Sequence, residues 1–176
     1  MKATGIVRRV DELGRLVIPK EIRRTLRIRE ADPLEIFTDR NGEIILKKYS
    51  PIRELASSAQ ELTEAMAQVS NQLVCVCDQD QVVAASGSDS RRYVGRPITL
   101  DLEVIMKKRQ IRCGNTAFCK IIDEDKSVSQ VIVPIICAGD VIGAVMILGN
   151  TDKSFGEHEQ KLAEVASAYL GKLLED

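Results

Sequence analysis

The first fifty residues hold only short apolar segments separated by strong turn signals, which limits what they can fold into. Four of these segments have the composition of β-strands: residues 4–10, 15–18, 33–38 and 43–48. After the second segment, Pro19 predicts the start of a short helix over residues 19–26. A unit of this size cannot bury a stable core by itself, and it contains no cysteine for a disulfide. We therefore expect it to fold as an obligate dimer.

Turn signals join the members of each predicted strand pair. The first turn spans residues 11–14 and ends in Gly14, which tolerates a positive φ. The second turn contains Asn41-Gly42, a dipeptide that favours two-strand hairpins. Each predicted pair is therefore a hairpin.

Charge is distributed unevenly along the chain. Residues 1–29 carry 9 basic and 3 acidic side chains, whereas residues 51–176 carry 13 basic and 18 acidic ones. A basic first part joined to an acidic second part indicates that only the first part meets a polyanion such as DNA. Basic surfaces are also often merely solvated, so charge alone leaves both interpretations open.

Residues 4–26, TGIVRRVDELGRLVIPKEIRRTL, closely resemble the AbrB family of bacterial transition-state regulators, and the similarity continues through residues 34–37 and 44–49. The resemblance implies a swapped-hairpin barrel over residues 1–50, a β-rich domain that two chains form together and that binds double-stranded DNA. It also implies which basic residues contact DNA: Arg8, Arg15, Arg23 and Arg24, with Arg9 and Lys2 as auxiliaries. Because no Asn or Gln is directed at base edges from a reading helix, we expect recognition that tolerates sequence variation and depends on DNA shape.

The chain departs from this family's pattern at two positions. Arg27 and Ala31 stand where many relatives have glycine. At Ala31 the chain lacks a residue suited to a positive φ after the helix, which predicts a slight shift of that turn.

Residues 51–70 form a predicted linker helix, with Ser50 as N-cap and Pro51 at the first helical position. Its apolar residues recur at alternating spacings of three and four, which is the pattern of a coiled-coil seam. The residues expected to pair between chains are Ile52, Leu55, Leu62, Met66 and Val69. The run covers only about two and a half heptads, so packing of the helix on its own second domain is an equal alternative.

Residues 71–176 have the pattern of one α/β domain and resemble a GAF domain, with an antiparallel sheet and flanking helices. The expected strands are residues 73–77, 82–85, 128–137 and 141–148, and the expected helices are residues 100–108 and a helix that begins at Ser154. The C-terminal helix has an apolar stripe of Leu162, Val165, Ala166, Tyr169, Leu170 and Leu173. Three roles remain open for this domain: sensing an unknown small ligand through segments 86–97 and 112–126, oligomerisation, or thiol-based enzyme activity.

The five cysteines argue against the enzyme. Cys75, Cys77 and Cys137 belong to apolar strands, while Cys113 and Cys119 lie in a polar segment and are the better candidates for a reactive thiol. We expect no metal or cofactor, because there is no Cys-x-x-Cys spacing and the single histidine, His158, lies at a predicted helix surface. Residues 123–125 are interpreted as an exposed acidic turn.

The resemblance implies a cytoplasmic, tetrameric transcription regulator of the sporulation or transition-state type, either an activator or a repressor. No apolar run is long enough to span a membrane, and the N-terminus lacks a signal-like segment. The alternative is an antitoxin-like partner protein, since antitoxins share the small barrel. Antitoxins usually add a disordered toxin-binding tail, whereas an ordered domain is expected here.

Overall fold

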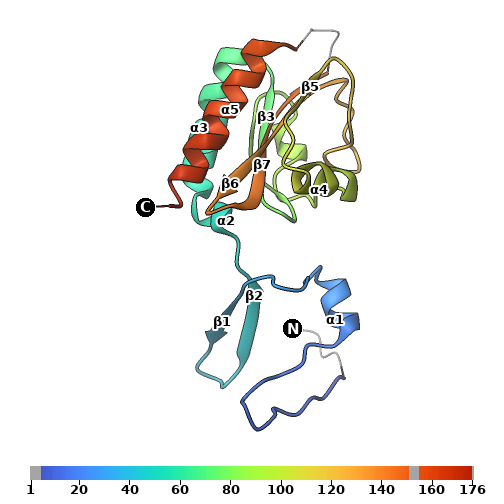
Figure 1. The fold of residues 1–176 in the computed structure, drawn as a ribbon, viewed down its shortest axis with the longest axis vertical. Helices are drawn as coiled ribbons and strands as arrows, with labels where there is room; N and C mark the ends of the chain where they lie inside the picture. The colour runs from blue at the N-terminus through green and yellow to red at the C-terminus, as the bar shows by residue number, and fades with distance from the viewer. Residues whose placement is uncertain (1–4, 151–154, 176) are drawn as a thin grey trace. The chain divides into compact units, whose positions relative to one another are not determined.

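A computed structural model describes residues 5–150 and 155–175, and the chain divides into two compact units, Met1–Tyr49 and Ser50–Asp176 (Figure 1). The first unit contains one helix and one hairpin: α1 (Lys20–Thr25), β1 (Leu34–Thr38) and β2 (Ile44–Lys48). Strands β1 and β2 pair in antiparallel register from Leu34 opposite Lys48 to Thr38 opposite Ile44. The predicted second hairpin and the short helix are therefore present.

The predicted first strand pair is wrong for the single chain, because residues 5–10 and 15–18 form no strand. A turn does form between them, in which the Asp11 N–H donates to the Arg15 carbonyl (3.0 Å) and the Gly14 N–H donates to the Asp11 carbonyl (3.0 Å). A strand persists only when a neighbouring strand completes its hydrogen bonds, and among the described residues of this chain no strand pairs with residues 5–18.

Helix α1 ends in a Schellman motif whose left-handed position is occupied by arginine. The Ile28 N–H donates to the Arg23 carbonyl (2.7 Å), and the Arg27 N–H donates to the Arg24 carbonyl (3.3 Å). Arg27 has a φ of 52°, and Ala31 in the following loop has a φ of 64°. These are the two positions at which the family pattern has glycine, so the chain accepts left-handed strain of about 1 kcal/mol at each.

The second unit contains more elements: α2 (Pro51–Glu54), α3 (Ala56–Ser70), β3 (Leu73–Cys77), β4 (Val82–Ser86), η1 (Ser90–Arg92), α4 (Leu100–Lys107), β5 (Arg112–Gly114), β6 (Ser129–Cys137), β7 (Asp140–Gly149) and α5 (Glu157–Lys172). Its strands form one antiparallel sheet in the order β4-β3-β7-β6-β5. Helices α3 and α5 lie side by side on one face of the sheet, and α4 lies on the other (Figure 1). No helix in the described ranges is both long and apolar enough to cross a membrane.

The central strands β6 and β7 have buried side chains on both faces, as their apolar sequences predict. Val133 and Val145 are paired across the two strands and point to the α3/α5 face, while the next pair, Ile132 and Met146, point to the α4 face. The sheet therefore separates two apolar cores and needs no second chain to bury its faces.

The predicted linker helix packs on its own domain and is interrupted at Leu55, between α2 and α3. Ile52 and Met66 are buried in the core between these helices and the sheet, so the structure corrects their assignment to a seam between chains. Leu55 and Leu62 are only partly buried against that core, and Val69 is exposed. The three-and-four spacing reflects mainly packing within the chain.

The helix start predicted at Ser154 moves to Glu157, and Ser154 itself lies outside the described residues. The Glu159 carboxylate accepts a hydrogen bond from the Gly156 N–H at 3.0 Å, so the helix is capped two residues later than expected. His158 is exposed, as predicted.

The acidic segment 123–125 is not a uniformly exposed turn, because Asp125 is buried. Its carboxylate accepts hydrogen bonds from the Tyr93 hydroxyl (2.8 Å), the Ile121 N–H (2.9 Å), and both the N–H and hydroxyl of Ser127 (2.9 and 3.0 Å). One buried carboxylate therefore organises the segment between β5 and β6. The missed signal was the Asp-x-Ser spacing, in which the aspartate binds the backbone two residues later.

We predict that Ala31→Gly raises the free energy of unfolding of the first unit by about 0.5–1 kcal/mol, because glycine relieves the left-handed strain. Glu30→Gly, at the neighbouring residue with negative φ, should instead lower it. Urea unfolding of the full chain measures both, and a lower midpoint for Ala31→Gly would contradict the strain argument.

We also predict that Asp125→Ala destabilises the second unit by about 2–3 kcal/mol, because four donors lose their acceptor in a buried environment. Asp123→Ala, at an exposed residue in the same segment, should change stability by less than about 0.5 kcal/mol. Thermal and urea unfolding of the two variants test this difference, and equal losses would show that the buried network carries no special stability.

Candidate nucleic-acid interface

The described arginines predicted to contact DNA occupy three segments of the first unit, and all of them are exposed. Arg8 and Arg9 lie on the segment before the first turn, Arg15 closes that turn, and Arg23 and Arg24 lie on α1. Lys2, the other predicted contact, lies outside the described residues. The structure thus places the arginines at the surface but does not join them through any shared contact.

Four of these arginines have no acidic partner among the described residues. The Arg8 guanidinium donates only to the neighbouring Val7 carbonyl at 3.2 Å, and no ion pair involves Arg9, Arg23 or Arg24. Their charges are therefore available to phosphates, for which a guanidinium has matching donor geometry. Arg23 and Arg24 also lie in the last turn of α1, where basic side chains favour the negative end of the helix.

Arg15 is the exception, because its Nε donates to Asp11 Oδ2 at 2.8 Å while the side chain remains 70% exposed. Asp11 Oδ1 also accepts from the backbone N–H groups of Leu13 (3.0 Å) and Arg15 (2.8 Å). The hydrogen bonds from the Arg15 backbone and then from its side chain hold the pKa of Asp11 below its ordinary value. Asp11 therefore stays ionised and anchors the turn, a role that sequence reasoning did not assign.

A second network holds the loop after α1 against the end of β2. Asp32 Oδ2 contacts Lys48 Nζ at 3.1 Å and accepts from the Arg29 N–H at 2.8 Å, while Lys48 also donates to the Arg27 carbonyl at 3.0 Å. Burial favours the neutral form of Asp32, but the bonds from Arg29 and Lys48 outweigh it and lower the pKa of Asp32. The network fixes the helix that carries Arg23 and Arg24 to the hairpin.

The first unit leaves most of its large apolar side chains exposed. Pro19 is the only buried residue between residues 5 and 49 of the described chain. The exposed set comprises Ile6, Val7, Val10, Leu13, Leu16, Val17, Leu26, Ile36, Phe37, Ile44, Leu46 and Tyr49. So much apolar surface on so small a unit marks a surface that associates with another protein surface.

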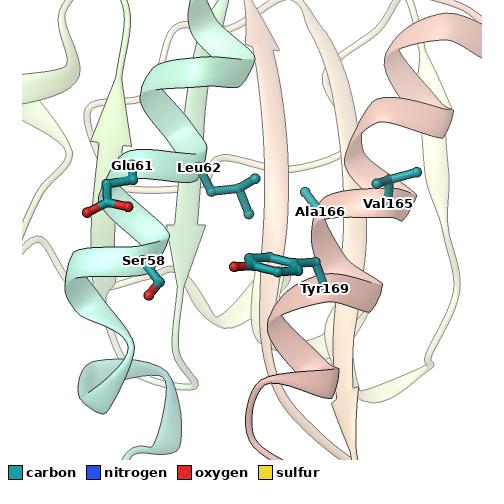
Figure 2. Close-up of a pocket in the computed structure, with 6 residues that line it drawn as sticks. All are labelled: Ser58, Glu61, Leu62, Val165, Ala166 and Tyr169. Carbon is teal, nitrogen blue, oxygen red and sulfur yellow. The ribbon is translucent and has the colours of Figure 1, made fainter.

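The second unit has an apolar groove of about 330 Å³ between α3 and α5 (Figure 2). The Tyr169 ring extends from α5 toward α3, and Leu62 extends from α3 toward α5, while Val165 also lines the groove. Val165 is 70% exposed and Tyr169 is 49% exposed, although the apolar stripe of the sequence predicted both to face inward. Of the predicted oligomerisation residues, only Leu62 lines this groove.

Four of the five cysteines, Cys75, Cys77, Cys113 and Cys119, are poorly suited to nucleophilic chemistry. Cys75, Cys77 and Cys119 are buried, so burial counts against Cys119, one of the two predicted candidates for a reactive thiol. Burial, and after it the charge of Asp125, raises the pKa of Cys119 to about 12. Burial also raises the pKa of Cys113, the other candidate. These thiols are protonated near neutral pH, and a protonated thiol is a weak nucleophile.

Two family models match the chain, one on each unit. Residues 54–175 match the model described as stage V sporulation protein T C-terminal, transcription factor. Residues 7–54 match the model described as antidote-toxin recognition MazE, bacterial antitoxin.

Two curated proteins from Bacillus subtilis (strain 168) are similar to this chain over different lengths. Stage V sporulation protein T is 49% identical over 179 residues, covering 99% of each protein. The transition state regulatory protein AbrB is 69% identical over 51 residues, which is 29% of this chain and 52% of that protein. The first relative therefore spans both units, and the second matches the arginine-bearing unit.

Solved structures with low sequence identity share the fold of the second unit. The GAF domain from an Acinetobacter phosphoenolpyruvate-protein phosphotransferase has a TM-score of 0.60 at 15% identity, covering 73% of this chain and 84% of that chain. A free methionine-R-sulfoxide reductase from Thermoplasma acidophilum has a TM-score of 0.52 at 14% identity, covering 68% and 94%. At these identities the likeness shows a GAF-like fold and nothing of its chemistry. With an AbrB-like unit followed by this GAF-like unit, the chain belongs to the stage V sporulation protein T family of transcription factors.

Proposed function

We propose that this chain is a cytoplasmic transcription regulator of the sporulation or transition-state type that binds double-stranded DNA through its first unit. The observation that carries the proposal is the set of exposed arginines without acidic partners in the described chain: Arg8, Arg9, Arg23 and Arg24. Arg15 adds a fifth guanidinium, which contacts Asp11 through Nε alone among the described residues. The 69% identity of this unit to a transition state regulatory protein supports the same function.

The DNA-binding body in this proposal is a dimer of first units. Burial of a large apolar side chain contributes about 1.5–3 kcal/mol of stability. Burying the exposed apolar side chains of residues 5–49 would therefore stabilise the unit considerably. A second copy that pairs with residues 5–18 would bury part of this set and complete the strands that one chain lacks. The dimer duplicates every arginine, which increases the number of phosphates that one complex can neutralise.

The second unit is assigned a role in assembly. Its α4 face is filled by buried side chains such as Tyr93, Leu102 and Met106, whereas the groove between α3 and α5 is apolar and open. Two copies that meet at this groove would form a four-helix contact, a common arrangement for symmetric association. Association through both units would join two dimers into a tetramer.

Toxin neutralisation is the second function that the family models raise. The antitoxin model matches only residues 7–54. The chain continues into a folded unit with its own sheet and two apolar cores, where an antitoxin would have a toxin-binding tail. We therefore favour transcription regulation.

For DNA binding, we predict a log–log dependence of affinity on salt with a slope of roughly −5 to −7, as expected if six to eight arginines of a dimer contact phosphates. Arg15→Ala combined with Arg23→Ala should weaken binding about a hundredfold and reduce the slope by about 3 to 4, because the dimer loses four contacts. The double variant Arg91→Ala with Arg92→Ala, in the exposed η1 of the second unit, is the matched control and should bind within about twofold of the unsubstituted chain. Fluorescence anisotropy across a salt series measures these values, and unchanged binding by the first double variant would refute the proposal.

For assembly, we predict that Val165→Glu converts a tetramer into dimers, because it introduces a second charged side chain among the residues that line the apolar groove, where Glu61 is the first. Val104→Glu, on the exposed side of α4, provides the control and should remain tetrameric. Sedimentation equilibrium distinguishes the two states. A tetrameric Val165→Glu chain, or an unsubstituted chain that sediments as a dimer, would contradict this assembly.

A further inference from the structure

The two turns of the first unit, residues 11–15 and 39–43, share one hydrogen-bonding plan although they differ in sequence. In each, the aspartate N–H donates to the carbonyl of the fifth residue, at 3.0 and 3.1 Å, and the N–H of the fourth residue, a glycine, donates back to the aspartate carbonyl, at 3.0 and 3.3 Å. The two glycines have φ values of 75° and 81°. Asp11 and Asp39 therefore begin equivalent turns.

The two aspartates also use one carboxylate oxygen identically. Asp11 Oδ1 accepts from the N–H groups of the third and fifth turn residues at 3.0 and 2.8 Å. Asp39 Oδ1 does the same at 2.9 Å for both. The two carboxylates therefore accept equivalent hydrogen bonds from the backbone of their turns.

The second carboxylate oxygen distinguishes the turns, because the fifth residue is Arg15 in one and Glu43 in the other. Asp11 Oδ2 accepts from the Arg15 Nε at 2.8 Å. Asp39 Oδ2 instead contacts the Asn41 side chain at 3.3 Å. Only the first turn couples its anchoring carboxylate to a cation.

The contact leaves the DNA-binding end of Arg15 free. Asp11 bonds to Nε, and in the described part of the chain no protein group is bonded to the two terminal nitrogens. These nitrogens are the donors that reach a phosphate or the O6/N7 edge of guanine. An unrestrained arginine loses about 2 kcal/mol of rotamer entropy when it is fixed, and a side chain already held at Nε loses less.

We propose that Asp11 is a positioning residue for DNA binding: its carboxylate restrains the Arg15 guanidinium through Nε, so that the terminal nitrogens remain available to DNA. This inference rests on the proposed DNA-binding function and adds to it the residue that prepares one of the contacts. It assigns a favourable effect to a negative charge that lies within the basic surface.

Simple electrostatics predicts the opposite effect. Removing a carboxylate near DNA reduces repulsion of the phosphates, so both Asp11→Asn and Asp39→Asn would strengthen binding. Positioning predicts weaker binding for Asp11→Asn alone, because only that carboxylate orients an arginine. The sign of the effect therefore separates the two explanations.

The experiment compares Asp11→Asn and Asp39→Asn in the full chain, with a labelled duplex selected from a random-sequence pool at fixed salt. We expect Asp39→Asn to bind as tightly as the unsubstituted chain or more tightly, and Asp11→Asn to bind about threefold to tenfold more weakly. In an Arg15→Ala background, Asp11→Asn should cause no further loss. A tighter or unchanged Asp11→Asn complex, or an equal loss with and without Arg15, would overturn the proposal.

Arg15→Lys tests the same idea with the turn carboxylate intact, which guards against a folding defect in Asp11→Asn. Lysine keeps the charge but cannot engage Asp11 and present a two-nitrogen fork at the same time. We expect affinity to fall about as far as in Arg15→Ala, and unsubstituted affinity would refute positioning. If the unsubstituted chain binds no duplex at all, the proposed function itself fails, which is distinguishable from each of these outcomes.

Discussion

The first unit cannot bury its own apolar surface, and the proposed organisation of the protein depends on this constraint. Pro19 alone is buried in the described part of that unit, and residues 5–18 have the composition of strands without a neighbouring strand. Polar networks hold the local pieces in place, such as the one that joins Asp32 to Lys48. Such networks fix shape, but they do not supply the hydrophobic free energy that a folded unit requires. In the proposed dimer, the apolar surface that joins the two chains also duplicates the DNA-contacting arginines.

The second unit meets the opposite condition, because its sheet is covered on both faces within one chain. Its remaining apolar surface is then available for association, and the groove between α3 and α5 offers a defined place for it. Ile52 and Met66 could not serve this purpose, since burying them in the core is what attaches α2 and α3 to the sheet. The two units thus favour association for different reasons: the first to complete its fold, the second after its fold is complete.

The sequence predicted those features whose causes are local. The apolar runs of β6 and β7 and the Asn41-Gly42 turn follow from neighbouring residues. It failed where the cause lies far away in the chain or in another chain. Strands in residues 5–18 need a partner, and the burial of Asp125 depends on Tyr93, 32 residues away. The family resemblance predicted which arginines contact DNA, but the hydrogen bond from Arg15 to Asp11 could not be read from composition.

The two equivalent turns show why charge counting is a poor guide to such a surface. A count of formal charges treats Asp11 as a loss and Arg15 as a gain, so their pair would contribute nothing. The geometry separates the two roles, because the carboxylate contacts Nε and leaves the terminal nitrogens exposed. A carboxylate that restrains an arginine has two opposite effects on DNA binding. It reduces the side-chain entropy that is lost on binding, and it also reduces the net positive charge. Which effect is larger depends on the arginine atom that the carboxylate contacts. In the second turn, where the fifth residue is Glu43, the same backbone hydrogen bonds form but the aspartate restrains no arginine. The proposed functional difference between the two turns therefore lies in the side chain of the fifth residue, Arg15 in one and Glu43 in the other.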